Sequence, residues 1–248
     1  GNGLLWQWLL GVGWRAVGIR TAPLLIALAY GLVVLAMAWR SASPLITVAT
    51  LRTDFPSFGP ERASAAERTR RAIELARELP DSGIDLVAFP ESTFVNVSTA
   101  AQLSAELQRL AQRTGAVVVA GEAASMKFES HVGSIGPQAD MRNGALVFEP
   151  GRPPRRYTKE LLVPFAEVTP LRGLIELPAW LVSPPAFEVT SGDSPDVLQT
   201  QSAGPIGVMV CWESVFAGHA RASVRAGARV LVQLANEGWF SSRAAGEQ

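Results

Sequence analysis

Apolar and polar residues follow one another along the chain in blocks that predict one long apolar helix and then alternating strands and helices. Nineteen uncharged residues, 21–39, lie between Arg20 and Arg40. At about 1.5 Å per residue, a helix of this length is about 28 Å long, close to the thickness of a bilayer core. Trp39 and Arg40 at one end are typical of the membrane interface. The pattern therefore predicts a transmembrane helix at about 21–39.

Two other interpretations of this segment stay open. A buried core helix has similar apolar residues, but it rarely runs so long without a polar face. A signal peptide fits the small-x-small pattern of residues 36–38, although the apolar run is long for a signal sequence and no initiator Met begins the chain. Residues 4–17 look like the end of another membrane or interfacial segment. We therefore expect the chain to be a piece of a longer protein.

From residue 45 onwards, short apolar runs alternate with amphipathic stretches, which is typical of an α/β fold. Strands are predicted at 45–51, 86–89, 116–120, 143–148, 205–210 and 230–234. Helices are predicted at 60–79, 100–113 and 215–226. A turn is predicted at 150–154, and the proline-rich residues 164–196 predict a long loop.

Composition and charge separate the first part of the chain from the rest. Residues 1–44 hold three arginines and no acid, so they carry +3; residues 45–248 hold the other 19 basic residues and all 22 acids, so they carry −3. We therefore expect a membrane segment at 1–44 and a catalytic domain at 45–248. The absence of a basic excess argues against a nucleic-acid-binding protein. The single cysteine excludes an internal disulfide framework and a Cys-rich zinc site.

Polar residues follow the ends of three predicted strands, which is where α/β folds collect functional groups. Glu91 follows the strand at 86–89, Cys211 follows 205–210, and residues 236–237 follow 230–234. A lone cysteine is more often a buried structural residue. Cys211, however, lies at a predicted strand-to-helix junction, where backbone amides favour a thiolate.

The residues present suit acyl transfer through a thiol. Such a reaction needs a base to take the thiol proton and a positive charge or donors near the oxyanion, and Glu91 and Lys159 can supply these. A solvated surface amine is the alternative interpretation of Lys159. His131 and His219 are the only histidines, and no H-E-x-x-H, G-x-S-x-G or phosphate-loop pattern occurs. We therefore predict neither a metal nor a cofactor.

Three segments in chain order resemble motifs of the nitrilase (carbon–nitrogen hydrolase) superfamily: residues 89–91, 157–165 and 210–214. The resemblance implies a four-layer α-β-β-α sandwich, which would be C-terminally incomplete in this chain. It also implies a Glu-Lys-Cys triad, with Glu91 as base, Lys159 as oxyanion stabiliser and Cys211 as nucleophile.

Within that superfamily the chain is most similar to the apolipoprotein N-acyltransferase family, through residues 159–170, 211–216 and 235–240. This resemblance implies a monomeric enzyme of the bacterial inner membrane with its catalytic domain on the periplasmic face. The reaction implied is transfer of an acyl chain from a phospholipid, through a thioester on Cys211, to the N-terminal diacylglyceryl-cysteine of lipoproteins.

The same resemblance gives supporting roles to four residues. Glu167 would hold the lysine, Glu213 would support the loop after the nucleophile, Trp239 would line the path of the acyl chain, and Trp212 replaces a Tyr or Phe of the family pattern. Val168 replaces a tyrosine of the family pattern, and the loss of the aromatic ring and hydroxyl bears on how the acceptor is recognised.

Two other functions stay open for the whole chain. One is a nitrilase-family amidase that hydrolyses a small C–N bond, and the other is an inactive membrane scaffold.

Overall fold

The computed structural model describes residues 14–40, 45–53, 55, 63–97, 99–126, 139–168, 187–193 and 197–236. Residue contacts divide the chain into two compact units, Gly1–Leu45 and Ile46–Gln248. The first unit contains helix α2 (Trp14–Arg40), and the second contains all the strands described below.

Helix α2 exposes its apolar side chains to the surroundings. Leu24, Ile26 and Tyr30 are each more than 60% exposed. Over the described chain, no helix is both long and apolar enough for a membrane span. The helix itself is present, but the structure does not support the transmembrane helix predicted at 21–39.

The larger sheet contains both parallel and antiparallel strands, and its parallel strands come first along the second unit. Its strand order is β1 (Val48–Thr50), β2 (Leu86–Val95), β3 (Val117–Met126), β4 (Ala139–Glu149) and β5 (Arg152–Thr158), and β6 (Phe187–Val189) pairs with β4. Strands β1, β2 and β3 are parallel, whereas β3, β4 and β5 are antiparallel neighbours. Strands β2 and β3 are buried on both faces at residues 86–89 and 117–120, which explains their continuous apolar sequence, whereas β1 is partly exposed.

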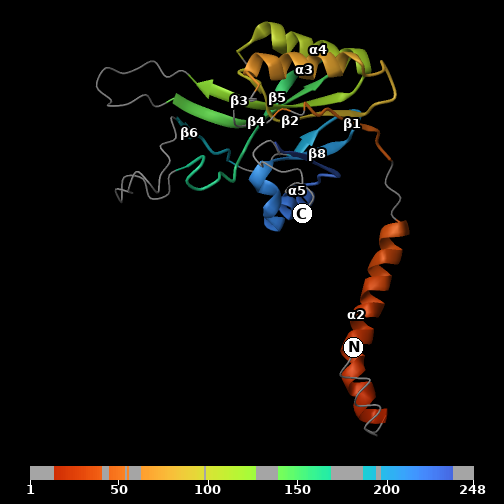
Figure 1. The fold of residues 1–248 in the computed structure, drawn as a ribbon. Coiled ribbons are helices and arrows are strands. Elements are labelled where there is room, and N and C mark those ends of the chain that lie inside the picture. Colours follow the sequence, from red (N-terminus) through yellow and green to blue (C-terminus); the bar gives the residue numbers. More distant parts are fainter. Residues whose placement is uncertain are drawn as a thin grey trace, which may run out of the picture. The chain divides into compact units, whose positions relative to one another are not determined.

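Two amphipathic helices cover one face of this sheet (Figure 1). Helix α3 (Ala65–Arg77) begins with a capping box, in which Ser64 and Glu67 each bind the other's backbone N–H. Helix α4 (Ala101–Thr114) ends at Gly115, whose left-handed conformation (φ 72°) closes the last turn. Their apolar faces pack on Val87, Phe89 and Val118 in one core.

A second core lies between the larger sheet and a smaller one. Among the described residues, the smaller sheet consists of β7 (Val197–Gln199), β8 (Pro205–Val210) and β9 (Val230–Leu234). Ile206, Val208 and Val232 of this sheet pack with Val119 and Val147 of the larger one. Helix α5 (Ala217–Arg225) contacts β8. The α/β class is therefore confirmed, and the complete four-layer sandwich stays a prediction.

The structure differs from the predicted elements where prolines or short strands occur. Residues 150–154, predicted as a turn, form a turn only at 150–151, and β5 begins at Arg152. Among the described strands, β5 pairs with β4 alone, and such an edge strand tolerates its two prolines. Strand β6 lies inside the predicted loop at 164–196. A short 3₁₀ helix (Cys211–Val215) precedes α5. The observed helix α5 therefore begins at Ala217, two residues after the start of the predicted helix at 215–226.

The close approach of β4 and β5 requires a glycine. A Cβ atom on Gly144 would lie 2.1 Å from the carbonyl oxygen of Tyr157. We expect Gly144→Ala to lower the free energy of unfolding by about 1–3 kcal/mol, because a backbone atom cannot rotate away. Denaturant titration measures this change. Gly218→Ala in α5 is the control, since its Cβ meets no atom within 4 Å and stability should stay equal or rise by up to about 1 kcal/mol. Equal effects of the two variants would contradict this explanation.

Candidate active site

Glu91 lies within strand β2 rather than after it, at a break in the strand. The pairing of β2 with β3 shifts between Phe89 and Phe94, and Ser92 has a positive φ of 53°. Gly121 of β3 makes room for this break, because a Cβ there would lie 2.1 Å from the carbonyl oxygen of Pro90. The irregularity turns the Glu91 side chain into the interior, where the residue is 6% exposed.

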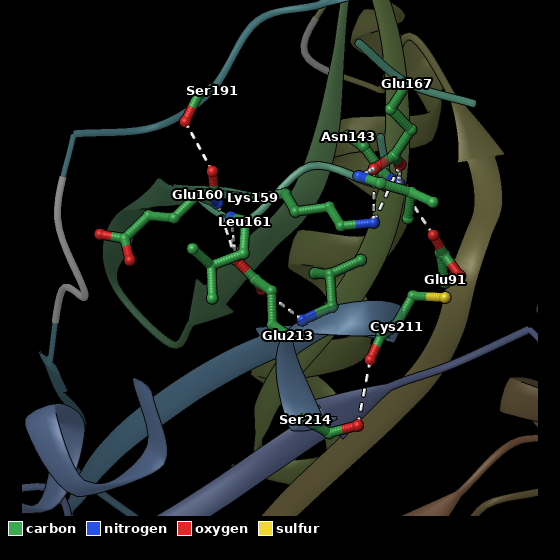
Figure 2. A network of polar contacts seen from close by, with 12 residues as sticks. Glu91, Asn143, Lys159, Glu160, Leu161, Glu167, Ser191, Cys211, Glu213 and Ser214 are labelled. Atoms are coloured by element: carbon green, nitrogen blue, oxygen red, sulfur yellow. Dashed lines mark hydrogen bonds and ion pairs between the residues drawn. The ribbon is translucent and has the colours of Figure 1, made fainter. Parts of the chain in front are cut away.

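Asn143 of β4 connects two acids of the site. Its Nδ2 donates to Oε1 of Glu91 at 2.8 Å and to Oε1 of Glu167 at 3.1 Å (Figure 2). The residue is 8% exposed. Reasoning from the sequence did not select Asn143. The sequence holds one indication of its role: Asn143 is a polar amide at the start of the apolar run 143–148. A polar side chain buried in such a strand needs hydrogen-bond partners.

Lys159 follows β5 and is completely buried. Its Nζ lies 2.9 Å from both carboxylate oxygens of Glu167. Glu167 also accepts a hydrogen bond from the backbone N–H of Val163 at 2.8 Å, which fixes the turn that returns toward the lysine. A buried ammonium group needs such a counter-charge, because its desolvation is otherwise too costly.

Cys211 is the first residue after β8 and has a strained backbone. Its φ is 52°, a left-handed conformation that is uncommon for residues other than glycine. The hydroxyl of Ser214 donates to the carbonyl oxygen of Cys211 at 3.1 Å, and Gln233 of β9 donates to that hydroxyl at 2.7 Å. These contacts hold the turn, and Figure 2 shows the sulfur pointing toward Glu91.

Burial and mutual contact set the ionisation of Glu91 and Cys211. Burial raises the pKa of Glu91, although the hydrogen bond from Asn143 and the charge of Lys159 oppose that rise. Burial and the charge of Glu91 raise the pKa of the Cys211 thiol to about 11, while Lys159 acts in the opposite direction. The proximity of the thiol to the Glu91 carboxylate also lowers the pKa of the acid and raises that of the thiol. The carboxylate is therefore the group placed to accept the thiol proton.

Glu213 joins the segment of Cys211 to the segment of Lys159. It is fully buried, and its Oε2 accepts from the backbone N–H of Val210 at 2.7 Å. Its Oε1 accepts from the N–H groups of Glu160 at 2.7 Å and Leu161 at 3.2 Å. The acid therefore connects the residue before the nucleophile with the residues that follow Lys159.

The remaining sequence-predicted residues lie at the margin of the site or outside the described residues. Trp212 is 38% exposed, and its ring packs edge to face on Phe216 with 5.6 Å between the centroids. Val168 pairs with Pro164 in the turn that carries Glu167. Trp239 lies outside the described residues.

The structure thus brings the predicted Glu91, Lys159 and Cys211 together with Glu167 and Asn143. A carboxylate that accepts the thiol proton and a buried cation beside it are the parts that covalent acyl chemistry requires. Within the described chain, no three His, Cys, Asp or Glu side chains are placed to hold a metal ion together.

Comparison with protein families gives a match over most of the chain. The model of the carbon–nitrogen hydrolase family matches residues 47–248, which include every residue of the site described above.

Curated relatives of the chain are named apolipoprotein N-acyltransferase. The protein of Geobacter metallireducens is 31% identical over 193 residues, which are 77% of this chain and 34% of that protein. The protein of Mycolicibacterium smegmatis is 25% identical over 242 residues, which are 90% of this chain and 40% of that protein. The chain therefore matches less than half the length of these relatives.

A solved structure supports the fold. Nit3 of Saccharomyces cerevisiae, a member of the nitrilase superfamily, has a TM-score of 0.51 and 18% sequence identity, covering 84% of this chain and 70% of Nit3. At this identity, the similarity shows the fold alone.

The coupling between Glu91 and Cys211 predicts an unusual response of the thiol to mutation. In Glu91→Gln, the negative charge beside the thiol is lost, so the pKa of Cys211 should fall from about 11 although catalysis is lost. The pH dependence of alkylation by iodoacetamide measures this pKa directly, because Cys211 is the only thiol. Glu106→Gln, which alters an exposed ion pair with Arg77, is the control and should leave the profile unchanged. An unchanged or higher pKa in Glu91→Gln would contradict the described contact.

Proposed function

Because the chain belongs to the carbon–nitrogen hydrolase family, we propose that residues 45–248 form a catalytic domain that transfers an acyl group through a thioester on Cys211. The observation that carries the proposal is the contact of the Cys211 thiol with the buried Glu91 carboxylate, beside the buried Lys159–Glu167 ion pair. The family match gives the class of chemistry, and the geometry gives each side chain a role.

The first half of the reaction forms the thioester. Glu91 takes the proton of the Cys211 thiol as sulfur attacks the carbonyl carbon of an ester, and Lys159 stabilises the negative charge that develops on the carbonyl oxygen. The C–O bond to the leaving alcohol then breaks, and Glu91 returns the proton to that oxygen. The raised pKa of Glu91 suits this exchange, because a carboxylate of higher pKa is a stronger base.

The second half transfers the acyl group to an amine. The amine nitrogen attacks the thioester carbon, Glu91 removes the proton that the nitrogen must lose, and the C–S bond breaks. The proton then returns to the sulfur, which restores the neutral thiol. Lys159 stabilises the same oxyanion in both halves, and Glu167 keeps the lysine in place.

The proposed acyl donor is a phospholipid, and the proposed acceptor is the N-terminal diacylglyceryl-cysteine of a lipoprotein. The names of the curated relatives support these substrates. We accordingly place the protein at the bacterial inner membrane as a monomer, with the catalytic domain on the outer, periplasmic face. The exposed apolar side chains of α2 are consistent with contact with lipid. Trp212 and Trp239 are proposed to border the path of the acyl chain.

Hydrolysis of a small amide is a second candidate, and the match to the carbon–nitrogen hydrolase family favours it. Both reactions pass through the same acyl-enzyme, so Glu91, Lys159 and Cys211 keep their roles. The two differ in what attacks the thioester, which is an amine in one case and water in the other.

The proposal predicts a trapped acyl-enzyme. Full-length protein incubated in detergent micelles with phospholipid carrying a labelled acyl chain should gain one label that hydroxylamine releases, because hydroxylamine cleaves thioesters. Cys211→Ala should gain none, and Lys159→Met should form it about 10²–10³-fold more slowly, as expected when an oxyanion donor is removed. Intact-mass spectrometry measures the label, with Glu106→Gln as the control variant.

The acceptor separates the two candidate reactions. Addition of a peptide that begins with diacylglyceryl-cysteine should move the label from the protein to the peptide amine. Release of free fatty acid at the same rate with and without the peptide would favour hydrolysis. Label that persists in Cys211→Ala would contradict the thioester altogether.

A further inference from the structure

A histidine outside the proposed reaction lies between two acids of the site. The ring of His219, on α5, is almost completely buried. Its Nδ1 lies 3.0 Å from Oε2 of Glu160, and its Nε2 lies 3.3 Å from the hydroxyl oxygen of Tyr157. Oε1 of Glu213 is 4.0 Å from the same Nε2. Both ring nitrogens therefore face acceptor groups.

The hydrogen bonds around this ring determine where the protons are. The hydroxyl of Tyr157 lies 2.9 Å from both carboxylate oxygens of Glu213, so its proton is directed to that acid. The tyrosine oxygen is then an acceptor toward Nε2, and the Glu160 carboxylate is an acceptor toward Nδ1. The ring therefore links Glu160, through Nδ1, to Tyr157 and Glu213, through Nε2.

The two acids that this ring joins belong to the two segments of the site. Glu160 directly follows Lys159, and Glu213 binds the backbone N–H of Val210, the residue before Cys211. The carbonyl oxygen of Glu160 also accepts from the hydroxyl of Ser191 at 2.7 Å. The position of His219 therefore affects both the lysine segment and the nucleophile segment, although the ring is bound to neither reacting side chain.

We propose that His219 is a positioning residue: in contact with Glu160 through Nδ1 and with the Tyr157–Glu213 pair through Nε2, it holds the Lys159 segment in register with the strained Cys211 turn. This inference rests on the proposed function for the identity of the reacting groups. Without the ring, Glu160 and Tyr157 lose the partner that they share, and the two segments can move apart. A displacement of about 1 Å between catalytic groups can lower a rate by about 10²-fold.

Three substitutions of His219 in the full-length protein separate its two contacts. His219→Asn keeps an N–H donor near the position of Nδ1, His219→Gln keeps one near Nε2, and His219→Ala keeps neither. Acyl transfer should fall by about 10²-fold in the alanine variant and by less in the two amides. Movement of Lys159 away from Cys211 should also raise the pH midpoint of Cys211 alkylation by iodoacetamide, because less positive charge near the sulfur favours the neutral thiol.

A control on the same helix distinguishes positioning from general stability. Ser223 is buried on α5, and Ser223→Ala removes only its 3.4 Å bond to the carbonyl oxygen of His219. This variant should keep the alkylation midpoint and the transfer rate of the unmodified protein. Variants of His219 that lower only the melting temperature, with both readouts unchanged in the folded protein, would overturn the proposal.

A double-mutant cycle tests the contact itself. Glu160→Gln should slow transfer, and combining it with His219→Ala should add little, because both remove the same link. Additive losses would overturn the proposed link through Glu160. If the unmodified protein forms no thioester with phospholipid but the His219 variants still shift the alkylation midpoint, the proposed substrate fails and the positioning role stands.

Discussion

A carboxylate that is buried away from water must be surrounded by hydrogen-bond donors, and the arrangement of the site depends on this requirement at Glu213. The desolvation of such a charge costs several kcal/mol unless donors replace the lost water. The donors come from Val210 on one side and from Glu160, Leu161 and Tyr157 on the other. Satisfying one buried charge therefore fixes the end of β8 against the segment that carries Lys159.

The same requirement sets the chemistry of the thiol. Burial disfavours both the carboxylate of Glu91 and the thiolate of Cys211, so a neutral thiol lies beside a carboxyl group of raised pKa. The nucleophile forms only as the proton moves to Glu91. Lys159 favours the charged forms of both groups, but Glu167 binds the lysine closely and keeps it from neutralising Glu91 directly.

The described domain contains the groups that covalent acyl chemistry needs, whereas the choice of substrates is proposed from the relatives. Strands β2, β4 and β8 and the segment after β5 supply the reacting groups, and these elements lie within the family match. The matched stretches make up only 34% and 40% of two acyltransferase relatives. Recognition of a lipid donor and a lipoprotein acceptor therefore remains the proposed part of the function.

The sequence by itself determined the α/β class, most of the strands and helices, and the candidate Glu91, Lys159 and Cys211, because apolar periodicity and short motifs are local properties. Only the tertiary structure selected Asn143 and His219, whose partners Glu91 and Tyr157 lie 52 and 62 residues away in the chain. Strand β5 was missed because its prolines are tolerated only through its place in the sheet. The length of an apolar run likewise predicted a span at 21–39 that the described helix does not support. Contacts distant in sequence leave no local pattern, so the fold alone decides them.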